Sequence, residues 1–286
     1  SKTVKFQSAS GNAAACIVST TTGNSQGVVE LNGADYVTFD KMTIINNLAS
    51  TCYGVFLKAG SDNDSITNCI ITHPVVGNSY SRGVYQNSTV NNYINIIGNT
   101  INNGYAGIDV YSNTSTYSNR FIIANNTING AFQYGIQTQY HDSMTITGNV
   151  ITSTSPAGGY SGIYMYWSQK APVLTKNKII YTSTSGSSSS FFGIQLSFFN
   201  VNTSDPLRGL IANNMIQVSG TTSTAYGLYM INSSNYVDIM HNTVSMTNTA
   251  NGGSFALYLS SGLSYLNIKN NIFQNTGNGT PTGSGF

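Results

Sequence analysis

The sequence predicts an all-β solenoid, a stack of coils in which each coil contributes a few short strands. Two sequence signals recur together along the 286 residues, and neither has the 3.6-residue spacing of an amphipathic helix. A repeat of this length has too little apolar surface to fold alone, so neighbouring repeats must share one continuous core. Hydrophobic residues make up 40% of the chain, which is enough to build such a core.

The first signal is a small residue followed by a short run of β-forming residues. It begins with GVVEL at Gly27 and ends with ALYLS at Ala256. The copies between them begin at Gly54, Gly83, Gly107, Gly135, Gly162, Gly193 and Gly227. Nine copies of one strand-forming run predict a regular stack of parallel strands.

The second signal is an apolar strand, a turn and the motif Asn-x-apolar, as in MTITGNVI. Successive Asn residues lie 23 to 37 positions apart, and Met42 takes the equivalent place in the first repeat. Stacking superimposes these positions at an internal turn, where each side-chain amide can bond the next and none is buried unpaired. We therefore predict a structural asparagine ladder of Asn68, Asn99, Asn126, Asn149, Asn177, Asn214, Asn242 and Asn271.

The repeated GN-x-I and NN-x-I turns resemble those of right-handed parallel β-helices of the pectate-lyase-like superfamily, over essentially the whole chain. The resemblance implies a right-handed parallel β-helix of about nine to ten coils, roughly 45 Å long. That superfamily includes carbohydrate lyases, glycoside hydrolases, phage tailspikes and surface proteins without known activity. The character of the repeat sequence is most similar to that of secreted bacterial surface proteins and adhesins. We expect one domain over residues 1–276 and a linker-like tail over 277–286, in a chain that is either a mature form or a piece of a longer protein.

The composition narrows the range of partners. Charged residues are 7% of the chain, against about 25% in ordinary soluble domains. Asn, Ser, Thr, Gln and Tyr must therefore supply most of the polar groups on the surface. A net charge of +2 without a Lys/Arg cluster gives no reason to expect nucleic acid as a partner. No apolar run approaches the length of a membrane span. The low charge and the abundant Asn and Tyr favour an extracellular or cell-surface location.

The cysteines and acidic residues give no strong metal or cofactor signal. Cys16, Cys52 and Cys69 are odd in number, so one internal disulfide at most is expected, with Cys16–Cys52 the pairing considered and Cys69 then free. The segment SDNDS (61–65) is the one candidate for weak Ca²⁺ binding, although Asp and Asn are equally typical of a turn. We predict no bound metal and no cofactor.

The outward-facing residues of the first strand in each repeat are predicted to form one face of the solenoid, rich in Tyr and side-chain amides. Because strand residues alternate, Ile136 should point inward and its neighbour Gln137 outward. One row is expected to comprise Val29, Phe56, Tyr85, Asp109, Gln137, Tyr164, Gln195, Tyr229 and Tyr258. A second row is expected to comprise Leu31, Lys58, Asn87, Tyr111, Gln139, Tyr166, Ser197, Ile231 and Ser260.

Aromatic rings and amides are what a neutral sugar requires, because its C–H faces stack on rings and its hydroxyls need polar partners. Insertions at 112–120 and 198–208 bracket two short coils, predicting a trough that holds the single tryptophan. The candidate ligand-binding residues are Tyr111, Gln137, Gln139, Tyr164, Tyr166 and Trp167. The alternative interpretation is that outward tyrosines merely form favourable cross-strand pairs.

Catalysis has only weak candidates, namely His141, Asp109, Asp142 and Lys170. A lyase needs a base and cations that neutralise a substrate carboxylate, and the supply here is thin. A glycoside hydrolase needs two carboxylates about 5–10 Å apart, which Asp109 and Asp142 on neighbouring coils can meet. The hydrolases of the resembled superfamily carry clustered Asp motifs, including adjacent pairs, and this chain has none. We therefore assign no catalytic residue.

These observations favour an extracellular structural or adhesive module that presents a Tyr/Gln-rich face to a glycan or a cell-surface protein. The alternative is a polysaccharide lyase or glycoside hydrolase with its site over residues 135–170. A second alternative is a fibre subunit that stacks end to end, because terminal coils of a solenoid expose strand edges.

Overall fold

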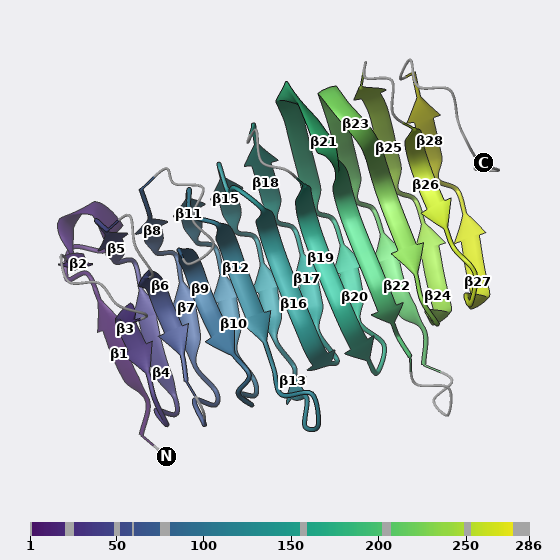
Figure 1. Cartoon of the computed structure of the whole chain (residues 1–286). Helices are drawn as coiled ribbons and strands as arrows, with labels where there is room; N and C mark the ends of the chain where they lie inside the picture. The colour runs from purple at the N-terminus through teal and green to yellow at the C-terminus, as the bar shows by residue number, and fades with distance from the viewer. Residues whose placement is uncertain are drawn as a thin grey trace.

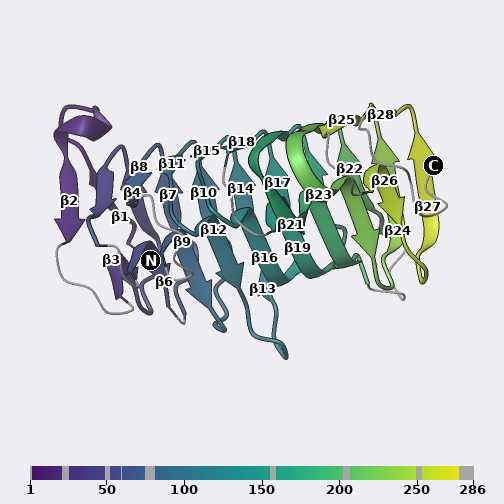
Figure 2. The same cartoon turned by 45° about the horizontal axis from the view of Figure 1, so that its top comes forward.

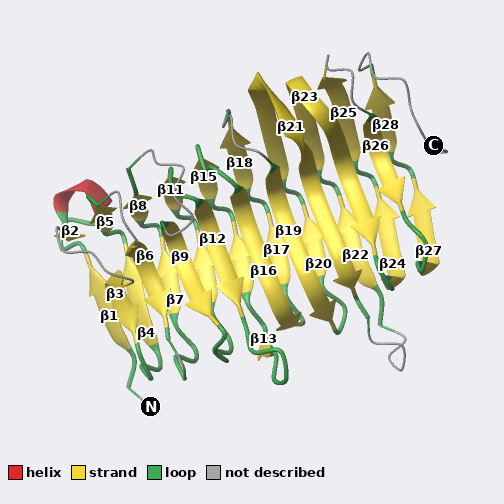
Figure 3. Cartoon of the chain, viewed as in Figure 1, coloured by secondary structure: helices red, strands yellow, loops and turns green. Residues whose placement is uncertain are grey.

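The chain winds into a right-handed parallel β-solenoid whose strands run across the long axis of a rod (Figures 1 and 2). The computed structural model describes residues 2–20, 26–48, 52–58, 60–74, 81–154, 159–201, 207–248 and 253–276. Strands dominate, and a short 3-10 turn, η1 (Ala13–Ala15), is the one helical segment among these residues (Figure 3). The predicted all-β fold is confirmed.

Each coil contributes strands to three parallel stacks, which we call the first, second and third ladders. The first ladder is a separate sheet of ten strands, in agreement with the predicted nine to ten coils. In order along the rod, it consists of β1 (Val4–Gln7), β4 (Val37–Asp40), β7 (Ser65–Thr67), β10 (Asn95–Ile97), β14 (Ile122–Ala124), β17 (Thr145–Thr147), β20 (Val173–Thr175), β22 (Gly209–Ala212), β24 (Asn235–Met240) and β27 (Ser264–Lys269).

The second and third ladders form one larger sheet, because β21 (Lys178–Phe199) and β23 (Met215–Ile231) run through both. Besides these two strands, the second ladder contains β2 (Ile17–Thr20), β5 (Thr43–Asn46), β8 (Ile70–Thr72), β11 (Thr100–Asn102), β15 (Thr127–Asn129), β18 (Val150–Ser153), β25 (Thr243–Asn248) and β28 (Ile272–Asn275). The third contains β3 (Gln26–Leu31), β6 (Cys52–Leu57), β9 (Arg82–Asn87), β12 (Ala106–Tyr111), β16 (Tyr134–Asp142), β19 (Tyr160–Gln169) and β26 (Ser254–Leu259), with β13 (Ser118–Asn119) beside β16.

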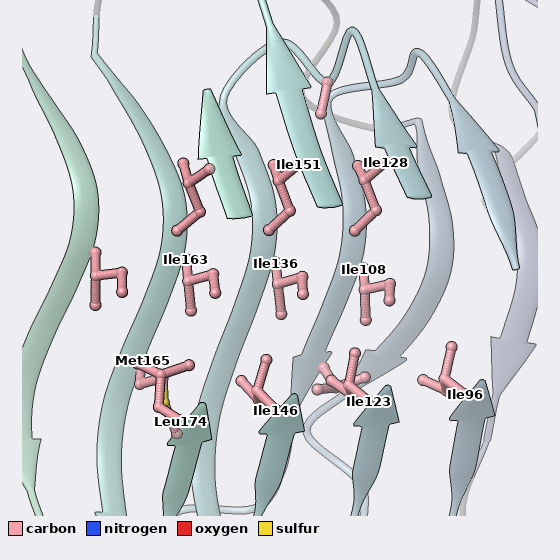
Figure 4. Packing of buried hydrophobic residues seen from close by; sticks show 14 of the residues in the cluster. Ile96, Ile108, Ile123, Ile128, Ile136, Ile146, Ile151, Ile163, Met165 and Leu174 are labelled. Carbon is pink, nitrogen blue, oxygen red and sulfur yellow. The ribbon is translucent and has the colours of Figure 1, made fainter. Parts of the chain in front are cut away.

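Stacked aliphatic side chains fill the interior, and each pairs in register with the same position of the next coil. In the third ladder Ile108, Ile136 and Ile163 are fully buried in one column (Figure 4). The second ladder contributes Ile128 and Ile151 in the same way. A one-residue slip would expose a whole strand's apolar set, so this burial fixes the register of the coils.

The asparagine ladder lies at the turn between the first and second ladders. From Asn99 to Asn271, each side-chain Nδ2 donates to Oδ1 of the next asparagine at 2.9–3.0 Å. The same Oδ1 atoms accept backbone N–H groups, as Asn149 Oδ1 accepts the N–H of Asn126 at 3.0 Å. Seven of the eight predicted asparagines therefore form the ladder.

The prediction for Asn68 was wrong, because its neighbour Cys69 occupies the ladder position. The N–H of Cys69 donates to Asn99 Oδ1 at 2.9 Å, whereas Asn68 has a left-handed φ of 53° and donates Nδ2 to Asp40 Oδ1 at 2.8 Å. The register decides this, because the inward Ile71 pairs with Ile101. The column continues through Met42, as predicted, to Cys16.

The three cysteines are free, so the disulfide considered between Cys16 and Cys52 is absent. Cys16 belongs to the column at the ladder turn, whereas Cys52 lies on β6 of the third ladder.

The two terminal coils expose apolar side chains. Val4, Phe6 and Ile17 are 46–59% exposed at one end, and Tyr265 and Ile272 are 64% exposed at the other. End-to-end stacking through these coils stays a prediction. No helix among the described residues is long and apolar enough to cross a membrane. The linker-like tail over 277–286 lies outside the described residues.

Candidate ligand-binding face

The outward residues of the third ladder form the predicted row almost completely. Register pairs connect Phe56, Tyr85, Asp109, Gln137, Tyr164, Gln195, Tyr229 and Tyr258. Glu30 takes the first place in this row, because Val29 pairs with the buried Val55. The expectation for Val29 was therefore wrong by one residue. Burial of apolar side chains, and not the position of the glycine, sets the register of this strand.

The second predicted row is also present from Asn87 to Ile231. Asn87, Tyr111, Gln139, Tyr166, Ser197 and Ile231 pair in register. Leu31 is 3% exposed and pairs with Leu57 in the core, so it does not belong to this row. We call the outward side of the two rows the outer face.

A column of aromatic residues borders the outer face where the coils bend. Tyr140, Trp167 and Phe198 have left-handed φ values of 60°, 56° and 54°. Each lies three residues after a member of the first row. The ring centroids of Tyr140 and Trp167 are 6.1 Å apart, and those of Trp167 and Phe198 are 4.4 Å apart. A left-handed backbone is uncommon for such bulky residues, so the stack of coils must hold it in place.

These rings and the candidates from the second row make one group. Tyr166 is 5.5 Å from Tyr140 and 5.7 Å from Phe198, with its plane at 82° and 87° to theirs. Tyr111 and Tyr117 each lie 5.7 Å from Tyr140. We call this set the central aromatic cluster; it consists of Tyr111, Tyr117, Tyr140, Tyr164, Tyr166, Trp167 and Phe198.

Three members of this cluster were not among the sequence candidates: Tyr117, Tyr140 and Phe198. The alternation of strand residues ends at the bend, so counting in twos from Gln137 passes over Tyr140. The constant three-residue offset from the first row is the signal that can find Tyr140, Trp167 and Phe198. Tyr117 belongs to the 112–120 insertion (Figure 1), which is anchored because Gln86 Nε2 donates to Ser118 Oγ at 3.0 Å. Of the other insertion, residues 202–206 lie outside the described residues.

The amide candidates differ in exposure. Gln139 is half-buried in the second row, whereas Gln137 is only 9% exposed. Gln137 therefore offers little surface, and the accessible groups of this part of the face are mainly aromatic.

Asp109 is committed to an ion pair. Its Oδ2 accepts a hydrogen bond from Arg82 Nε, and Asp109 is 5% exposed. Burial works to lower the pKa of Arg82, but the charge and hydrogen bond of Asp109 outweigh it, so the Arg82 pKa is raised. The guanidinium also lies 4.5 Å from the ring centre of Tyr85 and 5.6 Å from that of Tyr105. This pair joins neighbouring coils beneath aromatic rings.

His141, one of the weak catalytic candidates, lies inside the coil and not on the outer face. It is 1% exposed, its Nε2 is 3.2 Å from the carbonyl oxygen of Val110, and its ring packs edge-on against Phe121. Burial lowers its pKa to about 3. The left-handed bend at Tyr140 redirects the chain, so His141 points into the core although the alternation places it outside.

Asp142 and Lys170 form an ion pair at 2.7 Å, with the Lys170 side chain 51% exposed. Asp142 lies beyond the bend at Tyr140, while Asp109 pairs with Gln137 before it. Asp109 and Asp142 therefore lie on opposite sides of the bend, and each is held in its own ion pair, with Arg82 and Lys170 respectively. The structure therefore does not bring the four catalytic candidates together.

The acidic segment 61–65 binds backbone groups. Asp35 Oδ1 accepts the N–H of Asp62 at 2.9 Å, and Asp62 Oδ1 accepts that of Asn92 at 2.6 Å. Asp64 is fully buried, and its Oδ1 accepts the N–H of Val37 at 2.7 Å. Among the described residues no group of three His, Cys, Asp or Glu is arranged to hold a metal ion.

Asp64 gives a testable pH effect. Burial raises its pKa to about 6, with the charges of Asp35 and Asp62 adding to the rise and the Val37 N–H opposing it. The neutral carboxyl thus stabilises the fold below about pH 4, and this contribution is lost as the pH rises through 6. We expect Asp64→Asn to raise the free energy of unfolding by up to about 2 kcal/mol at pH 8 and by less at pH 4. Denaturation at both pH values measures this. An equal effect at both, or a larger one for exposed Asp35→Asn, contradicts it.

Similar chains are found among solved structures. The solenoid is similar to the GH136 lacto-N-biosidase from Eubacterium ramulus, with 12% identity over 87% of this chain and 51% of that chain and a TM-score of 0.48. It is also similar to PfbA, a surface adhesin of Streptococcus pneumoniae, with 12% identity over 87% of this chain and 62% of that chain and a TM-score of 0.47. The chain thus spans about half the length of the first of these proteins. A search of curated proteins found no match.

Likeness at this identity concerns the fold alone. The model of one protein family, described as the right handed beta helix region, matches residues 26–204. That match covers more than half of the 286 residues, and it agrees with the ladders and turns of the structure. The chain therefore belongs to the right-handed β-helix family.

Proposed function

We propose that this protein is an extracellular or cell-surface adhesive module that binds glycans through its outer face and does not turn them over. The observation that carries the proposal is the central aromatic cluster, in which seven rings from four successive coils meet on one side of the rod. Rings that are half-buried keep part of their apolar surface available for a ligand, while their scaffold keeps them in place.

Two features favour binding over catalysis. The carboxylates nearest the cluster are engaged by Arg82 and Lys170, and the one histidine nearby is buried with a low pKa. A general base must lie within hydrogen-bonding reach of the substrate proton that it removes. Groups that are already paired or buried do not meet this requirement. The low charge of the surface and the abundance of Tyr support an extracellular role.

A glycan array, run beside assays for unsaturated sugars and new reducing ends, tests the proposal. We expect glycan binding without product, weakened about tenfold or more by Trp167→Ala, because an aromatic anchor contributes more than 1 kcal/mol. Trp167→Phe should recover part of the affinity. The matched control is Tyr93→Ala, which removes a tyrosine that is 44% exposed at the next bend of the coil.

Three results would count against the proposal. Product formation would show an enzyme and would direct further tests to the Asp142–Lys170 pair, in which the lysine side chain is exposed. Binding that Tyr93→Ala weakens as much as Trp167→Ala does would place the site elsewhere. Binding to a protein receptor in the absence of any glycan binding would replace the glycan by a protein partner.

A further inference from the structure

Aromatic contacts continue beyond the central cluster toward the N-terminal coils. The rings of Tyr164 and Tyr134 are 6.0 Å apart, and those of Tyr134 and Tyr105 are 5.9 Å apart. The Arg82 guanidinium then bridges Tyr105 to Tyr85. Tyr85 lies 5.3 Å from Phe56. An unbroken path of contacting groups therefore runs from Phe56 to Phe198.

This aromatic path crosses six neighbouring strands of the third ladder, in the order β6, β9, β12, β16, β19 and β21. Five steps of about 4.8 Å give a length of roughly 24 Å along the rod. The ring-bearing residues of the path are half-buried, so each keeps some exposed surface. A surface of this length is larger than a single sugar or a disaccharide can cover.

The groups along the path carry little free charge. Arg82 is neutralised by Asp109, Lys170 by Asp142, and Lys58 by Glu30 at 2.6 Å. Burial and neighbouring tyrosines raise the pKa of Tyr164 to about 12, and burial foremost raises that of Tyr85 to about 12 as well, so these phenols stay neutral. A uronate polymer finds here no unpaired cation among the described residues of the path, and its carboxylates would have to be desolvated without compensation.

We propose that the ligand of the outer face is an elongated, uncharged glycan that lies along the axis of the rod and contacts the aromatic path over several coils. This inference rests on the proposed glycan-binding function and adds the chain length, the charge and the orientation of the ligand. Each further sugar along the axis reaches a ring of the next coil, so affinity rises with chain length. Neutral contacts make that affinity insensitive to salt, because no ion pair with the ligand is formed.

Titration calorimetry with neutral oligosaccharides tests this inference. The probes are the malto-, cello-, manno- and xylo-oligosaccharides from disaccharide to hexasaccharide, with galacturonate oligomers as the charged counterpart. We expect at least one neutral series to gain affinity with length, and no gain for the galacturonates. The affinity of the neutral series should change less than twofold between low salt and high salt.

Variants at the two ends of the path give the sharper test. Phe56→Ala should weaken the hexasaccharide about tenfold, equivalent to about 1.4 kcal/mol, and leave a short oligosaccharide bound at the central cluster unchanged. Phe198→Ala, at the other end and within the cluster, should weaken both. The control Tyr93→Ala should affect neither, and circular dichroism checks that each variant is folded.

Each alternative result has a clear meaning. Equal affinity for short and long neutral chains, or an equal loss on Phe56→Ala for both, would overturn the elongated ligand while leaving glycan binding intact. Tighter binding of galacturonates, weakened by salt, would overturn the neutral ligand. The absence of binding by any sugar would overturn the proposed function and this inference with it.

Discussion

Asn149→Ala should lower the free energy of unfolding by about 3–5 kcal/mol. Asn149 Oδ1 accepts both the backbone N–H and the Nδ2 of Asn126, at 3.0 and 2.9 Å. Its own Nδ2 donates to Asn177 Oδ1 at 2.9 Å and to the Ile123 carbonyl at 2.9 Å. Both asparagines of the first pair are fully buried, so no water replaces the lost acceptor. Each buried donor left without a partner costs about 1–3 kcal/mol.

Asn129→Ala is the matched control for this prediction. Asn129 lies three residues after the ladder residue Asn126 of the preceding coil. It also bonds neighbouring coils, because its Nδ2 donates to Asn102 Oδ1 at 3.1 Å and its Oδ1 accepts from Thr152 Oγ1 at 3.0 Å. It is only half-buried, so water can replace its partners and the loss should stay within about 1 kcal/mol. Urea denaturation followed by circular dichroism measures both variants. Similar losses for Asn149→Ala and Asn129→Ala would show that the interior ladder has no special role.

Gly135→Ala should destabilise the fold by about 3 kcal/mol or prevent folding. A Cβ at this position would lie 2.4 Å from the carbonyl oxygen of Gly162 and 2.5 Å from Cγ2 of Ile151. Both obstacles are fixed, because one is backbone and the other is packed in the core. Overpacking a tight interior typically costs about 1–3 kcal/mol and sometimes more. The same conflict, with the carbonyl oxygen of the next coil 2.3–2.7 Å away, recurs at Gly54, Gly83, Gly107, Gly162, Gly193 and Gly227.

The control lies in the same column, where the last position is Ala256. Among the described residues no further coil packs against it, so its methyl group meets no carbonyl of the kind that Gly135 faces. Ala256→Gly should therefore cost no more than about 1 kcal/mol, the usual price of glycine in a strand. Thermal unfolding compares the two variants. A Gly135→Ala protein with unchanged stability would show that the coils can separate to admit a methyl group.

The fold could be predicted from the sequence because each repeat carries its signals within a short stretch of chain. Each Asn-x-apolar turn specifies its own geometry, and stacking multiplies the effect of every turn. The motif placed Asn68 in the ladder, because Ile70 follows it by two positions, and this prediction was wrong, because Cys69 occupies the ladder position. The pairing of Ile71 with Ile101 settled the question, and that pairing depends on the neighbouring coil.

The candidate face was predicted in part for the same reason. Tyr111, Tyr164 and Tyr166 lie on regular strand, where alternation decides which side chains point outward, and they do contact the rings of the cluster. Beyond Tyr140 the backbone takes a left-handed turn, and alternation no longer applies. His141 consequently enters the core, and Tyr140 joins the aromatic column.

The sequence by itself thus determined the solenoid of strands, the asparagine turns and the outward rows, because all three follow from residue spacing along the chain. Only the tertiary structure decided which charges are neutralised, as in the Arg82–Asp109 pair, and why the column of small residues must be glycine. It also decided that rings from separate coils form one continuous path. These features depend on contacts between residues some thirty positions apart, and the distances between such residues exist only once the coils are stacked.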